Sequence, residues 1–524
     1  MRPRALLAAS LLALAPYAAL AQTVDTVLVI RRNVFDPDSF GGLFLTRFAN
    51  ALHVTTRDAT IRRALLVRQG QPYDSAIAAE SERNLRSLGV FRDVRLDTVL
   101  LADRTGRRAL ALRVETADGW STKPQAAYRS SDGSATWSVS LIEENFLGTA
   151  TQVAASYGRT PDRSELIVGF VDRVLTRHQA LLALQYARLS DGQVGSWVFG
   201  LPFVSATSRA SALTAGFASD DRVLVYRRGA LDAAYDRRSF VVEADAGLAL
   251  HATSRGYTRL WARAVGGRYD YALEGTGPLT RSTFATLGSG IEAARLRYAV
   301  LDNVNSFARR EDVDASQRVR AGLWATPRAW GYDPGHAGIG AEVSGQAALS
   351  GAASVLVLSA FARGVRSGGT LDSGRAQVSL TGLTRAFPGQ TMLASVTAGA
   401  THHAAAGGEY DLWQTLQGPR LYGAHAFTGS RAAWATLEDR ILVSDAVFGV
   451  LGVGLAPFAD WGLAWYPGDP RLPAGDAGLA LRFGATRSTR GDVVEIALGR
   501  RWGPGSGGSR WALSIGSSYR FLSP

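Results

Sequence analysis

The stretch that decides the fold lies at the end of the chain, where residues 511–521 read WALSIGSSYRF. In an extended strand, successive side chains point to opposite faces. One face carries large apolar and aromatic residues: Trp511, Leu513, Ile515, Tyr519 and Phe521. The other face carries small, polar or charged residues: Ser514, Gly516, Ser518 and Arg520. The alternation predicts a β-strand with one apolar and one polar face, which ends on an aromatic residue near the C-terminus.

The same alternation recurs upstream, through residues 122–524. One clear example has apolar residues at every second position: Val242, Ala244, Ala246, Leu248 and Leu250. In a sandwich such apolar faces would pack on each other, whereas in a membrane barrel they would face lipid. The pattern alone fits both. With about 25 residues for each strand and its connection, roughly 16 antiparallel strands would fit, an even number as in bacterial barrels.

The N-terminus has the layout of a secretory signal peptide. Arg2 and Arg4 precede an apolar run at residues 5–14, and Ala19-Leu20-Ala21 stands before Gln22. We therefore expect residues 1–21 to be cleaved. The best later candidate for a membrane helix, residues 447–465, contains four glycines and a proline and would form a poor helix. Export without such a helix favours a closed barrel, the other structure that satisfies its backbone in lipid.

The composition excludes several classes of function. The 524-residue chain has no cysteine, so disulfides, thiolate zinc sites and cysteine nucleophiles are impossible. Its net charge of +12 comes from scattered arginines with a single lysine, Lys123, which argues against a nucleic-acid patch. The motifs of serine hydrolases, zinc proteases and P-loops are absent. The adjacent pair His402 and His403 lies beside Gly407-Gly408 and is expected in a loop, and on a strand the two side chains would point to opposite faces and chelate a metal poorly. We expect no enzymatic activity, no metal, no cofactor and no nucleic acid.

Residues 22–117 predict a separate α+β module in the order β-α-α-β-β. Strands are expected at residues 27–30, 94–99 and 109–114, with a turn at 103–106. Asp58 and Asp74 are placed to cap two helices, and Gly89 is placed to end the second. The outer face of the second helix carries Glu80, Glu82, Arg83 and Arg86. This face is either solvated or a docking surface, and the strand edges could bind an extended peptide.

Several stretches resemble one family. Residues 70–74 (GQPYD), 80–86 (ESERNLR) and 89–94 (GVFRDV) resemble the core of a POTRA domain. This is the periplasmic module of the BamA/TamA-like outer-membrane assembly and translocation barrels, the bacterial surface antigen family. Residues 143–148 (EENFLG) resemble the opening of its barrel, and residues 511–521 resemble its C-terminal β-signal strand. Phe458, Asp460 and Gly462 match its F-x-D-x-G strand. The resemblance covers nearly the whole mature chain.

The chain departs from the family at one loop. The family folds a long loop into its barrel, with an Arg-Gly-aromatic tip followed by a Glu-x-Arg strand. Here the place is occupied by Leu421, Tyr422, Gly423 and Ala424, and the strand carries Glu438 and Arg440. Tyr422 stands where the family has arginine. Arg420, two residues earlier, is the candidate replacement, with Glu438 and Asp460 as its expected acidic partners in the barrel wall.

The resemblance implies a mostly β protein with a C-terminal transmembrane barrel in the cell outer membrane and one POTRA-like domain in the periplasm. It implies a monomeric barrel that assists the insertion or translocation of proteins. Its partners would be outer-membrane lipid, unfolded outer-membrane or secreted clients, and periplasmic accessory proteins. The residues leave other readings open, namely a pore or transporter for small solutes or lipids, an outer-membrane enzyme, and a soluble secreted β-protein.

Overall fold

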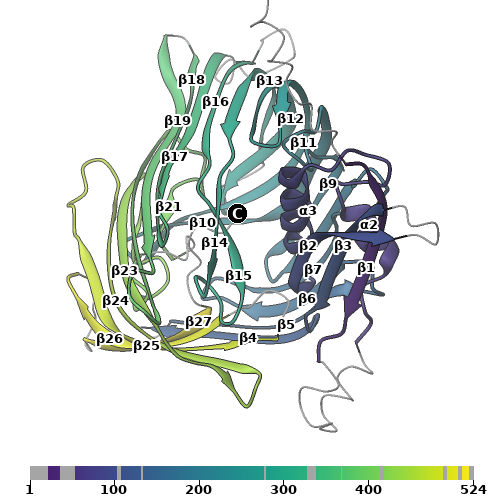
Figure 1. Cartoon of the computed structure of the whole chain (residues 1–524). Helices are drawn as coiled ribbons and strands as arrows, with labels where there is room; N and C mark the ends of the chain where they lie inside the picture. The colour runs from purple at the N-terminus through teal and green to yellow at the C-terminus, as the bar shows by residue number, and fades with distance from the viewer. Residues whose placement is uncertain are drawn as a thin grey trace, which may run out of the picture.

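The structure, a computed structural model, shows a small N-terminal α+β unit seated on one end of a large barrel (Figure 1). It describes residues 22–35, 53–102, 108–131, 134–276, 279–326, 338–367, 369–413, 418–487, 493–504 and 510–517. The predicted signal peptide and the predicted turn at 103–106 lie outside these residues. We call the end of the barrel that carries the N-terminal unit the domain end, and the opposite end the far end.

The N-terminal unit has the predicted order β-α-α-β-β. Its elements are β1 (Val24–Arg32), α2 (Asp58–Ala64), α3 (Ser75–Ser87), β2 (Phe91–Ala102) and β3 (Arg108–Asp118). The sheet order is β1-β3-β2, with β1 parallel and β2 antiparallel to β3. Asp74 caps α3 by accepting hydrogen bonds from the backbone N–H groups of Ala76 and Ile77. Asp58 does not cap α2, because it is the first helical residue and Arg57 is the N-cap.

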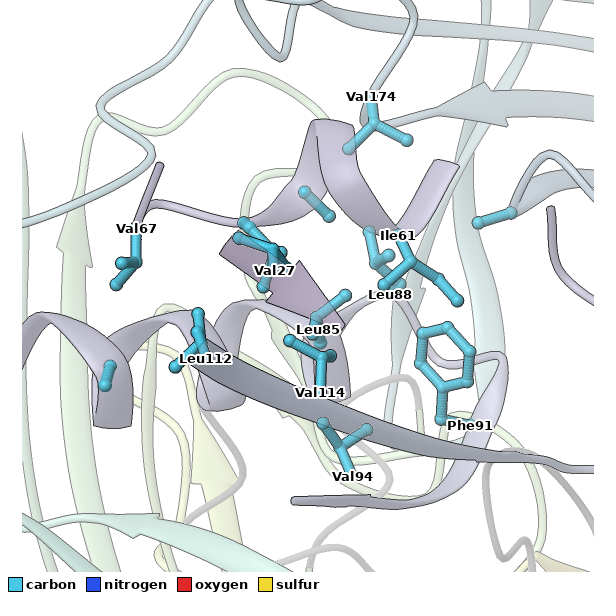
Figure 2. Packing of buried hydrophobic residues seen from close by; sticks show 14 of the residues in the cluster. Val27, Ile61, Val67, Leu85, Leu88, Phe91, Val94, Leu112, Val114 and Val174 are labelled. Carbon is cyan, nitrogen blue, oxygen red and sulfur yellow. The ribbon is translucent and has the colours of Figure 1, made fainter. Parts of the chain in front are cut away.

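The core of this unit is completed by the barrel. Ile61, Leu85 and Phe91 are fully buried between the helices and the sheet. Ala150 and Val174, from the β5–β6 and β7–β8 connections of the barrel, belong to the same apolar cluster, and Figure 2 shows Val174 above Ile61 and Leu88. Because apolar side chains from both parts are buried together, the unit is packed onto the domain end.

In the residues that the structure describes, twenty antiparallel strands form the closed barrel, with the last strand, β27, next to the first, β4. They are β4 (Thr122–Ser131), β5 (Ser134–Phe146), β6 (Thr151–Arg159), β7 (Ser164–Asp172), β8 (Leu181–Leu189), β9 (Gly192–Leu201), β10 (Ala210–Arg227), β11 (Ala230–Thr253), β12 (Gly256–Leu273), β13 (Thr280–Arg295), β16 (Gln317–Thr326), β17 (Gly338–Ser350), β18 (Ser354–Ser367), β19 (Thr370–Thr384), β20 (Gln390–His402), β23 (Arg431–Val447), β24 (Leu451–Trp465), β25 (Ala474–Ala485), β26 (Val493–Trp502) and β27 (Trp511–Ser517).

The expectation of roughly 16 strands was therefore wrong. Strands β6 to β9 have only nine or ten residues each, and several connections are as short as two residues. A strand with its connection thus takes fewer residues than was assumed. The strands of β10–β13 are much longer, and β11 has 24 residues. The pairing of β9 with β10 stops at Asp220, whereas β10 and β11 continue to pair to Arg227, so this hairpin extends past its neighbour at the far end.

Most outward-facing positions along the middle of the barrel strands are apolar. On β18, Leu356 and Leu358 face outward and are 42% and 45% exposed, while Val355 and Val357 between them face inward and are buried. Large apolar residues are similarly exposed on strands all round the ring, for example Val139, Leu166, Phe240, Leu323 and Leu479. Within the described ranges, no helix is both long enough and apolar enough to span a membrane.

Two segments fold inside the ring of strands. The internal hairpin, residues 296–316, connects β13 to β16 at the domain end and contains the strands β14 (Tyr298–Asp302) and β15 (Arg310–Asp314). The internal loop, residues 403–430, connects β20 to β23 at the far end and contains the short pair β21 (Tyr410–Asp411) and β22 (Thr428–Gly429). Figure 1 shows β14 and β15 lying across the opening, between the N-terminal unit and the β23–β26 wall. The sequence reasoning did not predict the hairpin.

Candidate functional site

The internal loop is folded against the inner wall by its own apolar cluster. Tyr410, Leu412, Tyr422 and Phe427 are buried together with Trp434 of β23. Leu421 enters a second apolar cluster, formed with Ala456 and Phe458 of β24 and with Ala480 and Ala497 of β25 and β26. These contacts hold residues 420–422 against the surface of β23–β26, and this fixes where the charged side chain of Arg420 lies.

Arg420 lies in a buried group of carboxylates from three wall strands. Its guanidinium binds Asp460 through two hydrogen bonds, Nε to Oδ2 at 2.6 Å and Nη2 to Oδ1 at 3.2 Å. It also donates to Glu438 Oε2 at 2.9 Å and to Glu495 Oε1 at 2.6 Å. The side chain of Arg420 is 5% exposed, and those of Glu438 and Asp460 are fully buried. Only arginine offers donors in the fork that this set of acceptors needs.

The strand β24 presents a column of inward-facing residues that matches this arrangement. Phe458 lies under the guanidinium of Arg420, whose Cζ is 4.1 Å from the ring centroid. Asp460, the next inward residue, forms the paired hydrogen bonds. Gly462 comes next, where a Cβ would lie 2.6 Å from the ring of Pro419. Each position of the F-x-D-x-G pattern therefore makes room for, or binds, the segment at residues 419–420.

The site contains more buried charged residues than Arg420 and its two predicted partners, Glu438 and Asp460. Four carboxylates and four guanidinium groups are buried around residues 420–422 on the lumen side of β23–β26: Glu438, Asp460, Asp476, Glu495, Arg420, Arg440, Arg482 and Arg501. The acidic and basic groups are equal in number, and their pairing offsets part of the cost of burying them. Asp476 accepts a hydrogen bond from the backbone N–H of Leu421 at 2.9 Å. Glu495 and Asp476 were not foreseen, although the alternation of β25 and β26 places both on the inner face.

Tyr422 does not take the place of the arginine. Its hydroxyl donates to the backbone oxygens of Gly475 at 3.2 Å and Trp502 at 2.5 Å, and its ring packs edge-on against Phe427. Gly423 beside it is half-buried. The structure thus brings Arg420, Glu438 and Asp460 together, while Tyr422 anchors the same loop through neutral hydrogen bonds further along the wall.

The loop also reaches the opposite wall. His425 Nδ1 lies 2.6 Å from Asp411 Oδ2, and its Nε2 lies 3.0 Å from Asp162 Oδ2 in the β6–β7 connection. Its ring stacks on Tyr226 of β10 at 3.7 Å. Strands β10 and β23 are nine positions apart in a ring of twenty, so the loop spans the lumen. Burial lowers the pKa of His425, but the two carboxylates outweigh this and raise it to about 9.

The C-terminal strand and the histidine pair were also singled out in the sequence. Trp511 and Leu513 of the C-terminal strand face outward and are 63% and 48% exposed; Ile515 is half-buried, and Tyr519 and Phe521 lie outside the described residues. His402 is the last residue of β20 and His403, with a φ of 46°, lies in the loop that was expected here, where the two rings stack on each other. No group of three or more potential metal-binding side chains occurs in the part of the chain that the structure describes.

The outer face of α3 is neither solvated nor open to a separate partner. Glu80 is buried and accepts a hydrogen bond at 2.6 Å from the backbone N–H of Ala206, in the β9–β10 connection. Arg86 binds Asp312 of the internal hairpin, and Arg83 lies over the ring of Tyr298 in the same hairpin. The solvated-face interpretation was therefore wrong, because these charges contact the barrel's own connections.

Comparisons with known proteins show only distant likeness. No family model and no curated protein matches the chain. Among solved structures, BamA from Haemophilus ducreyi lacking POTRA domains 1–3 matches with a TM-score of 0.38 and 10% identity over 94% of this chain and 85% of that chain. CdiB from Acinetobacter baumannii matches at 0.45 and 10% over 95% and 74%, and CdiB from Escherichia coli at 0.48 and 10% over 94% and 76%. These identities are too low to indicate a shared function.

Proposed function

We propose that the chain is an outer-membrane barrel that assists the insertion or translocation of proteins, with its N-terminal unit in the periplasm. The observation that carries the proposal is the internal loop, which crosses the lumen and is fixed to the wall by Arg420 within a buried charge cluster. A loop held in this way occupies the path that small solutes would take through an open pore. With the lumen occupied, a polypeptide client would have to pass along or through the wall of the barrel.

The membrane location is supported by the outer surface of the barrel. Leu323, Ile339 and Leu349 are 67%, 70% and 73% exposed, and similar residues face outward on nearly every strand. Soluble monomers rarely expose apolar patches larger than a few hundred Å². A membrane-spanning strand needs about 9–11 residues, which is the length of β6 to β9. The continuous apolar surface thus argues against the soluble secreted alternative.

The N-terminal unit supports a polypeptide client. In the described residues β1 and β2 are the outer strands of its sheet, and an outer strand can pair with an extended peptide through main-chain hydrogen bonds. The unit lies on the end of the barrel at which its own chain enters the first strand, β4. A client bound there would be near the place where β27 closes the ring against β4. Separation of that strand pair would open a lateral path into lipid.

The test is depletion of the protein in its own cell, with quantification of the outer-membrane proteome. A broad fall in other barrels would support general insertion, and loss of one or a few surface proteins would indicate a dedicated translocator. Complementation with Arg420→Ala should fail, while Arg281→Ala, which removes an exposed arginine near the start of β13, should restore the proteome. If depletion changes no outer-membrane protein, the proposal is wrong.

A second candidate function rests on a different part of the lumen. A cavity of about 540 Å³ lies along β12–β19 and is lined mainly by polar and charged residues, among them Glu292, Arg318, Arg320 and Gln346. Such a lining suits the passage of small polar solutes. Planar-bilayer recordings separate the two functions, because a solute pore gives steady conductance in the wild type, whereas a barrel blocked by its loop conducts only after the loop is released.

A further inference from the structure

The tip of the internal hairpin is seated in a glycine socket on β24. The ring of Phe307 lies on Gly452 and Gly454, where a Cβ at Gly452 would be 2.3 Å from its Cγ and one at Gly454 would be 3.3 Å from its Cε1. The guanidinium of Arg482, on β25, lies 5.5 Å from the centre of the same ring. Both glycines lie in the inward-facing column of β24 that continues to Phe458 and Asp460. The hairpin and the internal loop therefore use the same wall strand.

One buried carboxylate joins the two segments. Glu438 accepts from Arg420 of the internal loop through Oε2 and from Arg440 Nε through Oε1, at 2.9 and 2.6 Å. Arg440 in turn donates to the backbone oxygen of Val304 and to Asn305 Oδ1, both at the hairpin tip. The side chains of Glu438 and Arg440 are 0% and 2% exposed. In such a dry site a change at one partner strongly affects the others.

The other end of the hairpin is held by the N-terminal unit. Asp312 receives two hydrogen bonds from Arg86, both at 2.9 Å, and the side chains are 11% and 12% exposed. Arg86 also binds Glu82. Burial lowers the pKa of Arg86, but its contacts with Asp312 and Glu82 together outweigh this and raise the pKa. Between the two ends, Val304, Val313 and Ala315 pack on the inner face of β18–β20, which holds the hairpin as one body.

We propose that the internal hairpin couples the N-terminal unit to the internal loop, so that displacement of the unit from Asp312 releases the loop from Arg420's site. The contacts form a continuous series: α3, Asp312, the hairpin tip, Arg440, Glu438 and Arg420. A rigid element bound at both ends by charged contacts transmits a displacement because it cannot relax locally. This inference concerns regulation of the lumen. It goes beyond the proposed function and holds whatever passes through the barrel.

The absence of cysteine allows a direct test, because one introduced thiol is the only thiol in the chain. Ala426→Cys places a reporter in the internal loop, where Ala426 is half-buried against the loop's apolar cluster. The rate of maleimide labelling is measured in lipid nanodiscs, with and without Asp312→Arg, which places a second guanidinium beside Arg86. We expect labelling to rise about five-fold or more. Asp302→Arg, an exposed aspartate on the same hairpin, is the matched control and should leave the rate unchanged.

Coupling between two sites is reciprocal, so release of the internal loop must also loosen the internal hairpin. Val313→Cys places a reporter on the buried face of the hairpin, and Arg420→Ala should raise its labelling rate although the two residues are not in contact. A second variant, Gly452→Ala, acts on the socket and should raise labelling at both reporters. Gly195→Ala, on β9, has no atom within 4 Å of the added Cβ and serves as its control.

Heat-modifiable gel migration first establishes that each variant barrel is folded. If Asp312→Arg or Gly452→Ala frees the hairpin reporter but leaves the loop reporter protected, the hairpin is only a plug and the coupling is wrong. The coupling is supported if Asp312→Arg raises labelling at position 426 and Arg420→Ala raises labelling at position 313. The readout requires no client protein, so a failed proteome experiment overturns the proposed function and leaves this inference standing, and the reverse also holds.

Discussion

The two segments inside the barrel are attached to the same wall by different chemistry. The internal loop is attached to β23–β26 by a buried arginine that binds three carboxylates. The internal hairpin also binds Arg440 on β23, but most of its attachment is an aromatic ring on two glycines of β24 and apolar packing on β18–β20. A buried charge cluster tolerates little change, since loss of one member leaves the others unpaired in a dry site. An apolar contact weakens in proportion to the volume that is lost or added. The loop should therefore detach abruptly, and the hairpin gradually.

The largest effect is expected from Arg420→Ala. It leaves Glu438, Asp460 and Glu495 without their shared partner and should lower the free energy of unfolding by about 3–5 kcal/mol. Urea titration of the barrel in lipid vesicles measures this. Tyr422→Phe, which removes only a hydroxyl from the same loop, should cost about 1 kcal/mol. Equal losses in the two variants would show that the charge cluster does not dominate the attachment of the loop.

A smaller effect is expected from Gly452→Ala. The added Cβ would overlap Phe307, so the ring must move, at a cost of about 1–3 kcal/mol. The comparison becomes sharper with Phe307→Leu, which should partly restore stability in the Gly452→Ala background by removing the overlap. If the double variant is no more stable than Gly452→Ala alone, the socket does not bind the ring as described.

The far-end attachment should depend on pH. The pKa of His425 is raised from 6.5 to about 9, so its charged contacts with Asp162 and Asp411 stabilise the loop fully below pH 6.5. This contribution decreases above pH 6.5 and is lost as the pH rises through about 9. Labelling of the reporter at position 426, divided by that of a free cysteine at the same pH because the thiolate fraction itself rises with pH, should therefore increase between pH 8 and 10. His425→Gln should abolish that increase in the ratio. A flat ratio in the Ala426→Cys reporter with His425 intact would contradict the assignment.

The smallest effect is expected outside both attachments. Asp58 and Arg62 form an ion pair on α2, and their side chains are 46% and 47% exposed. Such a pair contributes about 0.3–0.5 kcal/mol, and less at high salt. Asp58→Asn should barely change the urea midpoint, and this variant sets the baseline for the other measurements. A loss near that of Arg420→Ala would show that the unit and the barrel unfold together through this helix.

The parts of the fold that sequence could predict are those set by local rules. The cap at Asp74 and the left-handed residue at Gly89 depend on a few neighbouring residues, and both are found where the pattern placed them. The strand number could not be predicted, because strand lengths run from seven described residues in β27 to 24 in β11. The length of a strand depends on its neighbours in the ring, which no local pattern reports.

The part of the candidate site that lies on regular strands could also be predicted. Glu438 and Asp460 lie on strands whose alternation and motif are visible in the sequence, and Arg420 is close to the expected position. The hairpin was not visible, because Val304 and Phe307 contact residues more than 50 positions away. One signal was available. The continuous apolar run of residues 355–358 does not alternate, and this indicates that both faces of β18 are covered.

The glycine socket has a consequence for the order of events during biogenesis. The hairpin comprises residues 296–316, whereas β24 and β25, on which its tip is seated, lie more than a hundred residues later in the sequence, at 451–485. The aromatic tip therefore has no place to bind until the C-terminal strands have joined the sheet. A seated tip therefore requires a sheet that already contains β24 and β25, so the position of the hairpin depends on how much of the wall has been assembled.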